Sequence, residues 1–539
     1  MGEDGRDRKV GALPVGPITL FRRAAPMNAT VEVLASPPTR RSLRLAATVF
    51  DATASLLVVS IYVACAWNLV AYPWDWSPDE GLYLDFARRL LDAPGSLYND
   101  RGVPVPAMYG PLYPALLAPM VRLAHPLAAA RALNLLCTLL GALAVATLIR
   151  RRAGWVWAAA GAALYLSIFD IASYFMLARM DSALIALWLW SAVVLLPREL
   201  RAGADQLSRG RMAGGTALLL AAALVKPTAV VHGLPLVLGW FLVDRRSAWR
   251  LMVALAVSGL AILALLQVAT GGGFVQAMLA WRLHGREPGL LSKILVDFSL
   301  RSWPVLALAL VSALAAGLAK ARPYREPACL MLVGGLLILP MASKAGALWN
   351  YLLPLYAALV VAAGCWAARA VAARNWQPVL PAAIAALSLA LATTQVFPLP
   401  TTFDEAAART LYGFVQDFHR KVGGPFLASS PDLVYFLVGE KTEIEGTSFS
   451  HLVDSGAPGA LDVLTRLEQA RYTLVVETWP LPAQRQWQAA LRRNYRPLGV
   501  CRLGSYFTGN DSRLYARRGL PVEFTPPAGV RCLAVPHGR

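Results

Sequence analysis

Charged residues are scarce in this 539-residue chain. They make up 15% of it, and 57% of its residues are hydrophobic, whereas soluble domains carry about 25% charged residues. Several apolar runs approach or exceed the roughly 20 residues with which a helix crosses a bilayer. A soluble fold cannot bury that many apolar runs, so the composition predicts a polytopic membrane protein.

The sequence also lacks the closely spaced cysteines that would indicate a metal site. None of its six cysteines forms a close metal-type pair, and no convincing fixed-period repeat is present. Four cysteines lie within or beside apolar runs and are expected to act as small hydrophobic residues. Cys501 and Cys532 lie in the polar C-terminal part, where a disulfide can form if the compartment is oxidising.

The net charge of +19 does not indicate nucleic-acid binding. Residues 399–539 contribute only +3 of it, with 16 Lys and Arg against 13 Asp and Glu. The remaining basic residues are scattered between the apolar runs, without a recognised nucleic-acid motif. Basic residues in such loops usually set the topology of a membrane protein, so no nucleic-acid partner is expected.

The apolar runs predict a helical protein with about eleven transmembrane helices. The stretch 109–124 holds Pro111, Pro114 and Pro119, so it is predicted to lie at the interface or re-enter. Pro227 is expected to break or kink one long helix after Lys226. The predicted spans are residues 46–72, 126–148, 154–177, 182–197, 213–226, 228–243, 250–269, 303–319, 327–342, 347–368 and 377–397.

The arginine-rich short loops predict the orientation. With eleven spans, all of these clusters fall on one side, which the positive-inside rule assigns to the cytoplasm. The protein is therefore predicted to lie in the inner (plasma) membrane with a cytoplasmic N-terminus and an extracytoplasmic C-terminus. The clusters are Arg40/Arg41/Arg44, Arg150/Arg151/Arg152, Arg198/Arg201/Arg209/Arg211, Arg245/Arg246/Arg250, Lys320/Arg322/Arg325 and Arg369/Arg374.

Two long loops and the C-terminal part are predicted on the opposite, outer side. The loops are residues 73–108 and about 270–302, and their own basic residues dilute the charge bias, which suggests an anionic partner for them. These residues are Arg88, Arg89, Arg101, Arg282, Arg286, Lys293 and Arg301.

The sequence divides into three parts. Residues 1–44 are polar and rich in Arg, Pro and Gly, and are predicted to be a disordered cytoplasmic N-terminus. Residues 45–398 form the transmembrane domain with the outer loop 73–108. Residues 399–539 suffice for a core of their own and are predicted to form a soluble α/β domain. Its expected elements are a helix to about residue 421 after the capping box 402–405, strands at 424–428 and 472–476, and helices at 431–438 and 483–493.

Two adjacent carboxylates, Asp79 and Glu80, follow the first span. They open an amphipathic segment through Leu82, Phe86 and Leu90 that suits a helix lying on the membrane surface. A carboxylate held there could act as a general base on an acceptor hydroxyl. The alternative is that one of the two acids only caps this helix.

Other polar residues are predicted at the outer ends of the spans, each with a structural alternative. Tyr109 can anchor the chain at the interface, and Arg179 with Asp181 can form a water-facing turn. Lys226 and Lys344 can hold a lipid phosphate as point charges or extend to the interface. Residues from distant sequence positions thus converge on one face, and these carboxylates and cations suit a reaction on a phosphate-linked substrate: Asp79, Glu80, Arg179, Asp181, Lys226, Lys344 and Asn350.

These features resemble the GT-C glycosyltransferases. The closest resemblance is to bacterial members of glycosyltransferase family 39, which are protein mannosyltransferase-like or aminoarabinose transferase-like. It covers most of residues 45–400 in pattern. Its sharpest pieces are Asp79-Glu80-Gly81-Leu82-Tyr83, Gly110-Pro111-Leu112-Tyr113-Pro114, and Lys344 and Gly346 followed by Asn350-Tyr351. One departure is Tyr109-Gly110-Pro111, where the mannosyltransferases usually have His-Pro-Pro or Asn-Pro-Pro, which puts the acceptor class in doubt.

The resemblance implies inverting transfer of a sugar from a polyprenyl-phosphate donor. It implies that Asp79 is the base and that Glu80 orients the site or helps to bind a divalent metal, where one is used. Cations would then receive the charge of the leaving phosphate. The substrate-binding residues expected on these grounds are Tyr83, Tyr109, Arg179, Asp181, Lys226, Lys344, Asn350 and Tyr351.

The predicted function is therefore a membrane glycosyltransferase acting on the extracytoplasmic face. Its partners would be a polyprenyl-phosphate-linked sugar, membrane lipids, and a cell-envelope glycan, lipid or protein as acceptor. One alternative is a transporter or flippase of lipid-linked sugars, although such proteins place polar groups near the midplane and often have paired repeats. A non-catalytic membrane scaffold is the other alternative, and it would not need Asp79 or Lys344.

Overall fold

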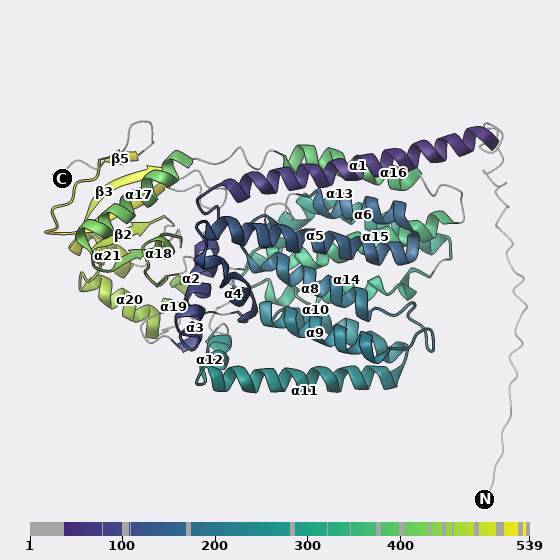
Figure 1. Cartoon of the computed structure of the whole chain (residues 1–539), viewed down its shortest axis with the longest axis horizontal. Helices are drawn as coiled ribbons and strands as arrows, with labels where there is room; N and C mark the ends of the chain where they lie inside the picture. The colour runs from purple at the N-terminus through teal and green to yellow at the C-terminus, as the bar shows by residue number, and fades with distance from the viewer. Residues whose placement is uncertain are drawn as a thin grey trace, which may run out of the picture. The chain divides into compact units, whose positions relative to one another are not determined.

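The computed structural model (Figure 1) describes most of the chain as helix. The chain divides into two compact units, Met1–Ala46 and Ala47–Arg539, and all contacts given below belong to the second. Helix α1 begins at Pro37, seven residues before the predicted end of the N-terminal segment at residue 44, and residues 1–36 lie outside the described part. The described residues are 37–77, 79–99, 107, 109–168, 174–280, 286–320, 322–344, 347–372, 379–397, 405–429, 433–444, 449–454, 458–478, 485–502, 511–525 and 532–534.

Helices, most of them apolar, make up most of the described chain as far as residue 397. In order they are α1 Pro37–Ala71, α2 Asp79–Asp92, α3 Ser96–Asn99, α4 Leu112–Leu117, α5 Pro126–Ala153, α6 Trp155–Leu166, α8 Met180–Leu195, α9 Arg209–Val225, α10 Ala229–Leu238, α11 Arg245–Ala269, α12 Gly273–Ala280, α13 Leu290–Leu318, α14 Ala328–Leu336, α15 Leu353–Ala372 and α16 Val379–Leu391. Short 3-10 turns follow α10 and α14 and precede α15, and a π-helical turn extends α16 to Val396.

Each of the eleven predicted spans overlaps one of these helices. Among the described residues, six helices are long and apolar enough to cross a membrane: those at 41–71, 126–153, 245–269, 290–318, 349–372 and 379–396. Four more are apolar but shorter, at 155–166, 180–195, 229–242 and 328–341. The stretch 109–124 forms only a six-residue helix and a 3-10 turn, too short to span. The membrane class is thus supported, and the number of eleven spans stays a prediction.

Two predicted boundaries differ from the structure. Helix α13 begins at Leu290, so much of the predicted loop 270–302 is helical. Ile294, Phe298, Ser302 and Val305 are all buried, and this spacing continues one apolar helix face through the charged residues that suggested a loop. Helix α6 ends at Leu166, eleven residues before the end of the predicted span.

The core of the helical part is helix α15. In its most apolar window 94% of the residues are buried, compared with 6% for α11, which Figure 1 shows at the edge of the helices. Helix α15 packs against α5, α6, α13 and α14. Gly335 allows the close approach of α14 to α15, because a Cβ there would lie 2.6 Å from the Cα of Leu355 and clash with it.

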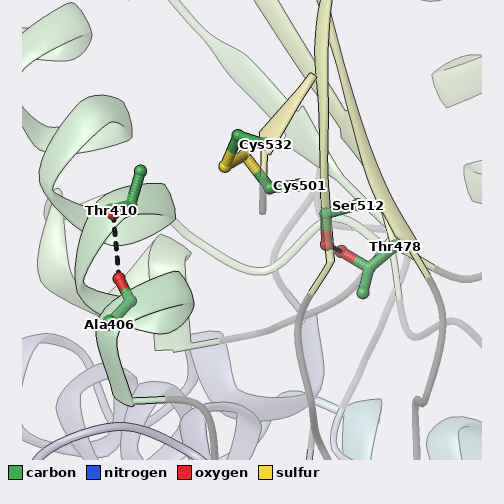
Figure 2. Close-up of a disulfide and its surroundings, with 6 residues drawn as sticks. All are labelled: Ala406, Thr410, Thr478, Cys501, Ser512 and Cys532. Atoms are coloured by element: carbon green, nitrogen blue, oxygen red, sulfur yellow. Dashed lines mark hydrogen bonds between the residues drawn. A yellow bond between two sulfur atoms is a disulfide. The ribbon is translucent and has the colours of Figure 1, made fainter. Parts of the chain in front are cut away.

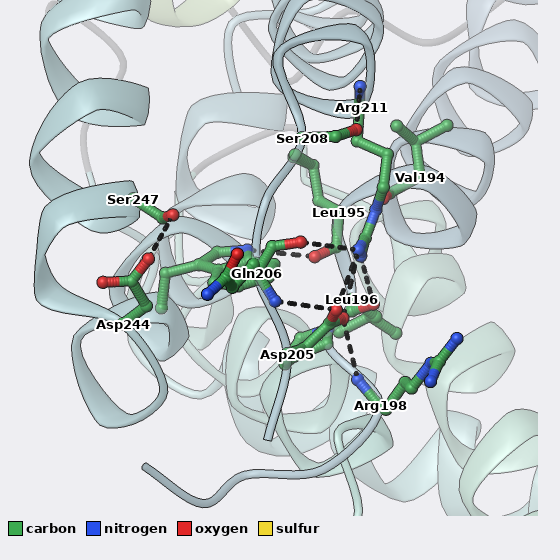
Figure 3. A network of polar contacts seen from close by, with 12 residues as sticks. Val194, Leu195, Leu196, Arg198, Asp205, Gln206, Ser208, Arg211, Asp244 and Ser247 are labelled. Atoms are coloured by element: carbon green, nitrogen blue, oxygen red, sulfur yellow. Dashed lines mark hydrogen bonds and ion pairs between the residues drawn. The ribbon is translucent and has the colours of Figure 1, made fainter. Parts of the chain in front are cut away.

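A polar network closes the end of α8 opposite its Asp181 terminus (Figure 3). The guanidinium of Arg211 donates to the carbonyls of Val194 and Leu196 at 3.0 and 3.1 Å and pairs with Asp205. These carbonyls lack partners within the helix. Arg211, which the loop charges assign to topology, therefore also caps a helix.

The C-terminal region, described from Glu405 to Ala534, is a mixed α/β structure. Its helices are α17 Glu405–Val422, α18 Leu433–Leu437, α19 Phe449–Asp454, α20 Pro458–Glu468 and α21 Arg485–Asn494, and its strands are β1 Phe426–Ala428, β2 Leu474–Glu477, β3 Tyr495–Arg502, β4 Asp511–Arg517 and β5 Cys532–Ala534. The five strands form one sheet in the order β1-β2-β4-β3-β5, in which only the β1–β2 pair is parallel.

The sheet has a different apolar layer on each face. Leu427 and Val475 face a core shared with α20 and α21, whereas Ala428 and Val476 face the side of α17 and α18. That second core is continuous with the core of the transmembrane helices. The α/β prediction for this region is therefore matched in its elements, while a domain boundary near residue 398 stays a prediction.

Cys501 and Cys532 form a disulfide that joins β3 to β5 (Figure 2). The two residues are opposite each other in the antiparallel pair. The bond links the last described strand to the sheet. The sequence left open whether these two cysteines pair, and in the structure they do.

Candidate active site

The acidic pair at the start of α2 separates into two environments. Glu80 is fully buried, and its two carboxylate oxygens accept hydrogen bonds from Nε and Nη2 of Arg131 at 2.8 and 2.7 Å. The backbone amides of Trp76 and Ala178 donate to the same oxygens. Burial would by itself raise the pKa of Glu80, but the charge and hydrogen bonds of Arg131 and these amides hold that pKa below its usual value.

Arg131, on α5, fixes the chain that leads into α2. Its guanidinium also donates to the carbonyls of Leu69, Tyr72 and Trp74 at 2.6–2.8 Å. Sequence reasoning missed this residue. The available signal was an arginine inside a predicted span, which is costly in a membrane and rarely without a role. Glu80 and Arg131 together form a buried ion pair that sets the position of Asp79.

Asp79 points to a different cation. Its carboxylate forms an ion pair with the guanidinium of Arg179, and the Asp79 side chain is 19% exposed. Arg179 also donates to Ser77 Oγ at 3.0 Å and lies over the ring of Tyr174. Asp79 is therefore the member of the acidic pair that a substrate can reach.

The ion pairs continue from Arg179 into the helical part. Arg179 Nε lies 3.4 Å from Asp181, and Asp181 accepts a hydrogen bond of 2.9 Å from Lys226 Nζ. The side-chain amide of Asn350 donates to Asp181 at 3.3 Å, and its own Oδ1 is buried without a hydrogen-bond partner among the described residues. Asp79, Arg179, Asp181 and Lys226 thus form a chain of alternating charge with no net charge.

Two aromatic rings enclose the lysine. Lys226 Nζ lies 4.9 Å from the ring centre of Tyr351 and 5.9 Å from that of Tyr109. Such rings attract a cation by their quadrupole. Lys226 ends α9 in an extended conformation, as expected for the residue before Pro227, and this turns its side chain out of the helix axis.

Gly110 explains the Tyr109-Gly110-Pro111 motif. A Cβ at Gly110 would lie 1.8 Å from the carbonyl oxygen of Leu224, so only glycine allows the chain to pass the end of α9. This close approach brings Tyr109 to Lys226. The motif therefore has a packing role next to the cluster.

Two predicted residues lie at the edge of this cluster. Tyr83 is buried in an aromatic group with Phe86, Tyr109 and Tyr113. Lys344 pairs with Arg286 in an isolated β-bridge, six residues before Asn350. The structure thus brings together Asp79, Tyr109, Arg179, Asp181, Lys226, Asn350 and Tyr351, with Glu80 and Tyr83 packed beside them, and places Lys344 on the neighbouring segment.

The described arginines of the predicted outer loops contact the protein itself. Arg88 and Arg89 both pair with Asp85 on their own helix, and Arg301 lies 4.5 Å from the ring centre of Trp349. Arg101 and Arg282 lie outside the described residues. The partner predicted for Arg88 and Arg89 is thus an acid of the same chain.

The acidic residues of the cluster do not suit a metal ion. In the part of the chain that the structure describes, no three His, Cys, Asp or Glu residues are placed to hold one. Glu80 is occupied by Arg131, and both Asp79 and Asp181 already face Arg179. No catalytic step is therefore assigned to a metal below. A cavity of about 660 Å³ lies elsewhere, on α17 between Glu405 and Asp417, and contains none of the predicted residues.

Comparisons with known proteins identify the fold. No protein-family model matches the chain, and neither does any curated protein sequence. Among solved structures, the chain is similar to ArnT from Cupriavidus metallidurans bound to undecaprenyl phosphate, with a TM-score of 0.58 and 15% identity over 85% of this chain and 97% of that one. The same ArnT without ligand gives a TM-score of 0.54 at 14% identity over the same shares of both chains.

An archaeal protein gives a further match. The oligosaccharyltransferase of Archaeoglobus fulgidus in its apo form has a TM-score of 0.51 and 12% identity over 89% of this chain and 76% of that one. At such low identity these matches show the fold alone. The chain has the GT-C fold, as its sequence predicts, and its placement in glycosyltransferase family 39 stays a prediction.

Proposed function

We propose that this protein is a membrane glycosyltransferase that moves a sugar from a polyprenyl-phosphate donor to a cell-envelope acceptor, with inversion, on the extracytoplasmic face. The observation that carries the proposal is the charge chain Asp79–Arg179–Asp181–Lys226 on a GT-C fold. It offers a reachable carboxylate beside two buried cations, which is what sugar transfer from a lipid phosphate needs. One similar structure, ArnT, holds undecaprenyl phosphate.

The proposed reaction is a single displacement at the anomeric carbon. The acceptor hydroxyl oxygen attacks from the face opposite the phosphate, and the bond from that carbon to the phosphate oxygen breaks. Asp79 accepts the hydroxyl proton, and the bonding electrons leave with the lipid phosphate. Arg179 and Lys226 stabilise its charge, since both are held in a buried site where such interactions are strong.

Because Asp79 is paired with Arg179, binding of the sugar donor is also proposed to activate the base. A carboxylate that pairs with a guanidinium is a weak base, because the ion pair favours its charged form. The donor phosphate offers Arg179 an alternative bidentate partner. Donor binding would therefore draw Arg179 away from Asp79, and the base would become active only with the donor in place.

Asn350 and Glu80 are proposed to support this arrangement. The unpartnered Oδ1 of Asn350 lies beside Asp181 and can accept a hydrogen bond from a sugar hydroxyl. Glu80 has donors on both oxygens, so its role is to orient the start of α2 rather than to react. The rings of Tyr109 and Tyr351 hold Lys226 in position.

The side of the membrane is inferred from two observations. The arginine-rich loops fall on one side of the predicted spans, and the C-terminal region carries a disulfide, which persists in oxidising compartments. Both favour an inner-membrane protein with the C-terminal region and the cluster outside the cytoplasm. Acceptors there are envelope glycans, lipids or proteins.

Transfer activity in membranes tests the proposal. Wild type, Asp79→Asn and Asp462→Asn would be given a panel of labelled polyprenyl-phosphate sugars and envelope extract, at matched expression. Asp462 is a suitable control because it is 57% exposed and pairs only with Arg466 in the C-terminal region among its described contacts. We expect transfer by the wild type and the control, and a loss of at least about 100-fold for Asp79→Asn.

Three other outcomes would reject parts of the proposal. Equal transfer by all three proteins would exclude Asp79 as the base. No transfer by the wild type, together with movement of labelled lipid-linked sugar across reconstituted vesicles, would favour the transporter. Envelope assembly in cells that survives alanine at both Asp79 and Lys344 would favour a scaffold.

A further inference from the structure

The C-terminal region contacts the chain on both sides of Asp79. Helix α2 packs against α18, which Figure 1 shows beside it. The loop before α2 contacts α17. Nothing in the reaction proposed above uses these contacts. They connect the segment around the proposed base to residues more than 300 positions away in the sequence.

The first contact is at the loop between α1 and α2. The hydroxyl of Tyr412, on α17, donates to the carboxylate of Asp75, four residues before Asp79. The rings of Tyr412 and Trp74 are stacked with centres 4.9 Å apart. Asp75 and Tyr412 are both buried, so this contact is shielded from water.

The second contact is on the C-terminal half of α2. Asp85 is fully buried, pairs with both Arg88 and Arg89, and accepts a hydrogen bond of 3.0 Å from the backbone amide of Thr442. Arg89 donates to the carbonyl of Thr442 at 2.9 Å. Arg88 donates to the carbonyls of Phe436 and Glu440.

Three of the four backbone groups in these bonds, the amide and carbonyl of Thr442 and the carbonyl of Glu440, lie outside regular secondary structure. Residues 438–444 follow α18 without regular secondary structure, so their amides and carbonyls need partners when buried. The Asp85–Arg88–Arg89 group supplies them. The contact therefore fixes position and is not a loose apolar packing.

We propose that the C-terminal region acts as a clamp that positions the base, with Asp85, Arg88 and Tyr412 as its positioning residues. The loop that carries Asp79 is held by Arg131 from the helical side and by Tyr412 from the other. Helix α2 is then held again at Asp85. This keeps Asp79 at one distance from the site of attack, where an error of about 1 Å can cost about 100-fold in rate.

The clamp is tested by changing each contact separately, in the full-length protein in nanodiscs. Tyr412→Phe removes the hydrogen bond to Asp75, and Arg88→Gln removes the bonds to Phe436 and Glu440. The matched controls are Tyr515→Phe, which loses a tyrosine–carboxylate contact inside the sheet, and Arg420→Gln, which loses an exposed ion pair on α17.

Two readouts separate the clamp from general stability. Hydrogen exchange of peptides covering residues 79–92 is expected to become at least about 10-fold faster in the two clamp variants and to stay at the wild-type rate in the controls. The kcat of transfer is expected to fall about 10-fold, with KM for the donor within about two-fold of wild type. Arg88→Lys, which keeps the charge, should recover part of the lost kcat.

The outcomes distinguish this inference from the proposed function, on which its kinetic half rests. Wild-type exchange rates in both clamp variants would overturn the clamp. Faster exchange with an unchanged kcat would overturn the positioning role. If the wild type transfers no sugar, the proposed function fails, and the exchange rates alone still decide whether the clamp exists.

Discussion

Lys226 Nζ donates a 2.9 Å hydrogen bond to the carboxylate of Asp181, and both side chains are at least 95% buried. Removal of either partner leaves the other charge buried without its nearest counterion, and Asp181 then keeps, among its described contacts, only the longer ones with Arg179 and Asn350 at 3.4 and 3.3 Å. We therefore expect Asp181→Asn and Lys226→Met each to lower the stability by about 3–5 kcal/mol, and the double variant to lose less than the sum.

Thermal unfolding of the four proteins in one detergent measures this coupling. The exposed pair Glu405 and Arg409 on α17 serves as the matched cycle, with an expected coupling below about 1 kcal/mol. Additive losses for Asp181 and Lys226 would show that the two residues do not act as a pair.

The tight passage at Gly110 predicts a strong effect of one methyl group. In Gly110→Ala the new Cβ would overlap the carbonyl of Leu224, so α4 and the end of α9 must separate. We expect the free energy of unfolding to fall by about 1–3 kcal/mol, the usual cost of overpacking. The contact between the Tyr109 ring and Lys226 should also weaken. Gly317→Ala is the control, because it lies in helix α13 with open space around the added Cβ, and there alanine should be neutral or slightly stabilising.

The two neighbouring acids should respond in opposite ways to loss of charge. Glu80→Gln leaves Arg131 buried without its anion, so we expect a stability loss of about 3–5 kcal/mol. Asp79→Asn should lose transfer while keeping the unfolding temperature close to that of the wild type, since its side chain is partly exposed. Unfolding temperature and transfer activity are measured in parallel for both variants. Equal destabilisation by both would contradict a structural role for Glu80 that is separate from the catalytic role of Asp79.

The buried Asp75 predicts how stability depends on pH. Burial raises the pKa of Asp75 to about 8, with Tyr412, Glu80 and Arg131 as further influences. The unfolded chain releases this proton near pH 4, so between about pH 4 and 8 the folded protein holds a proton that the unfolded one lacks. Stability should therefore fall as pH rises through this window, by at most about 1.4 kcal/mol per pH unit from this group.

Asp75→Asn removes this contribution while keeping an acceptor for Tyr412. The difference in unfolding temperature between the variant and the wild type should grow in favour of the variant from pH 5 to pH 8. A constant difference over that range would show that Asp75 does not change its protonation on unfolding.

The cations of the site predict that transfer activity does not respond to chelators. Arg179 and Lys226 occupy the positions from which a divalent cation would contact Asp79 and Asp181. Transfer in the presence of EDTA should stay within about two-fold of the untreated rate, because fixed cations can stabilise the leaving phosphate. Loss of activity on chelation, restored by adding back one divalent metal, would contradict this.

The sequence was informative where one physical rule dominates. Apolar length predicts most of the long helices, and Pro227 predicts the break after Lys226. The loop charges predict one common face for Asp79, Arg179, Asp181 and Asn350, and the structure joins these residues by ion pairs and a hydrogen bond. The separation of Asp79 from Glu80 could not be read from two adjacent letters. It depends on Arg131, whose position inside a predicted span indicates a role but does not show which acid it pairs with.

The less predictable parts depend on tertiary contacts. Strand β3 contains Pro497 and Gly499, which weaken a strand pattern, and the ladder shifts register between them. Strand β4 did carry a readable signal, since Ser512, Leu514 and Ala516 alternate with more exposed residues. The rings around Lys226 come from residues 109 and 351, and their meeting follows from the packing of α4, α9 and α15 rather than from any local pattern.

The bond between Cys501 and Cys532 also changes what a protease would leave behind. It closes a loop of 31 residues that includes Arg513, Arg517 and Arg518, each a trypsin target. A single cut inside this loop would break the backbone, but the disulfide would keep the two fragments covalently linked. They would migrate together on a gel until a reductant was added. The final segment can thus be severed and still remain in its strand, so an intact band on a non-reducing gel says little about whether the backbone is continuous.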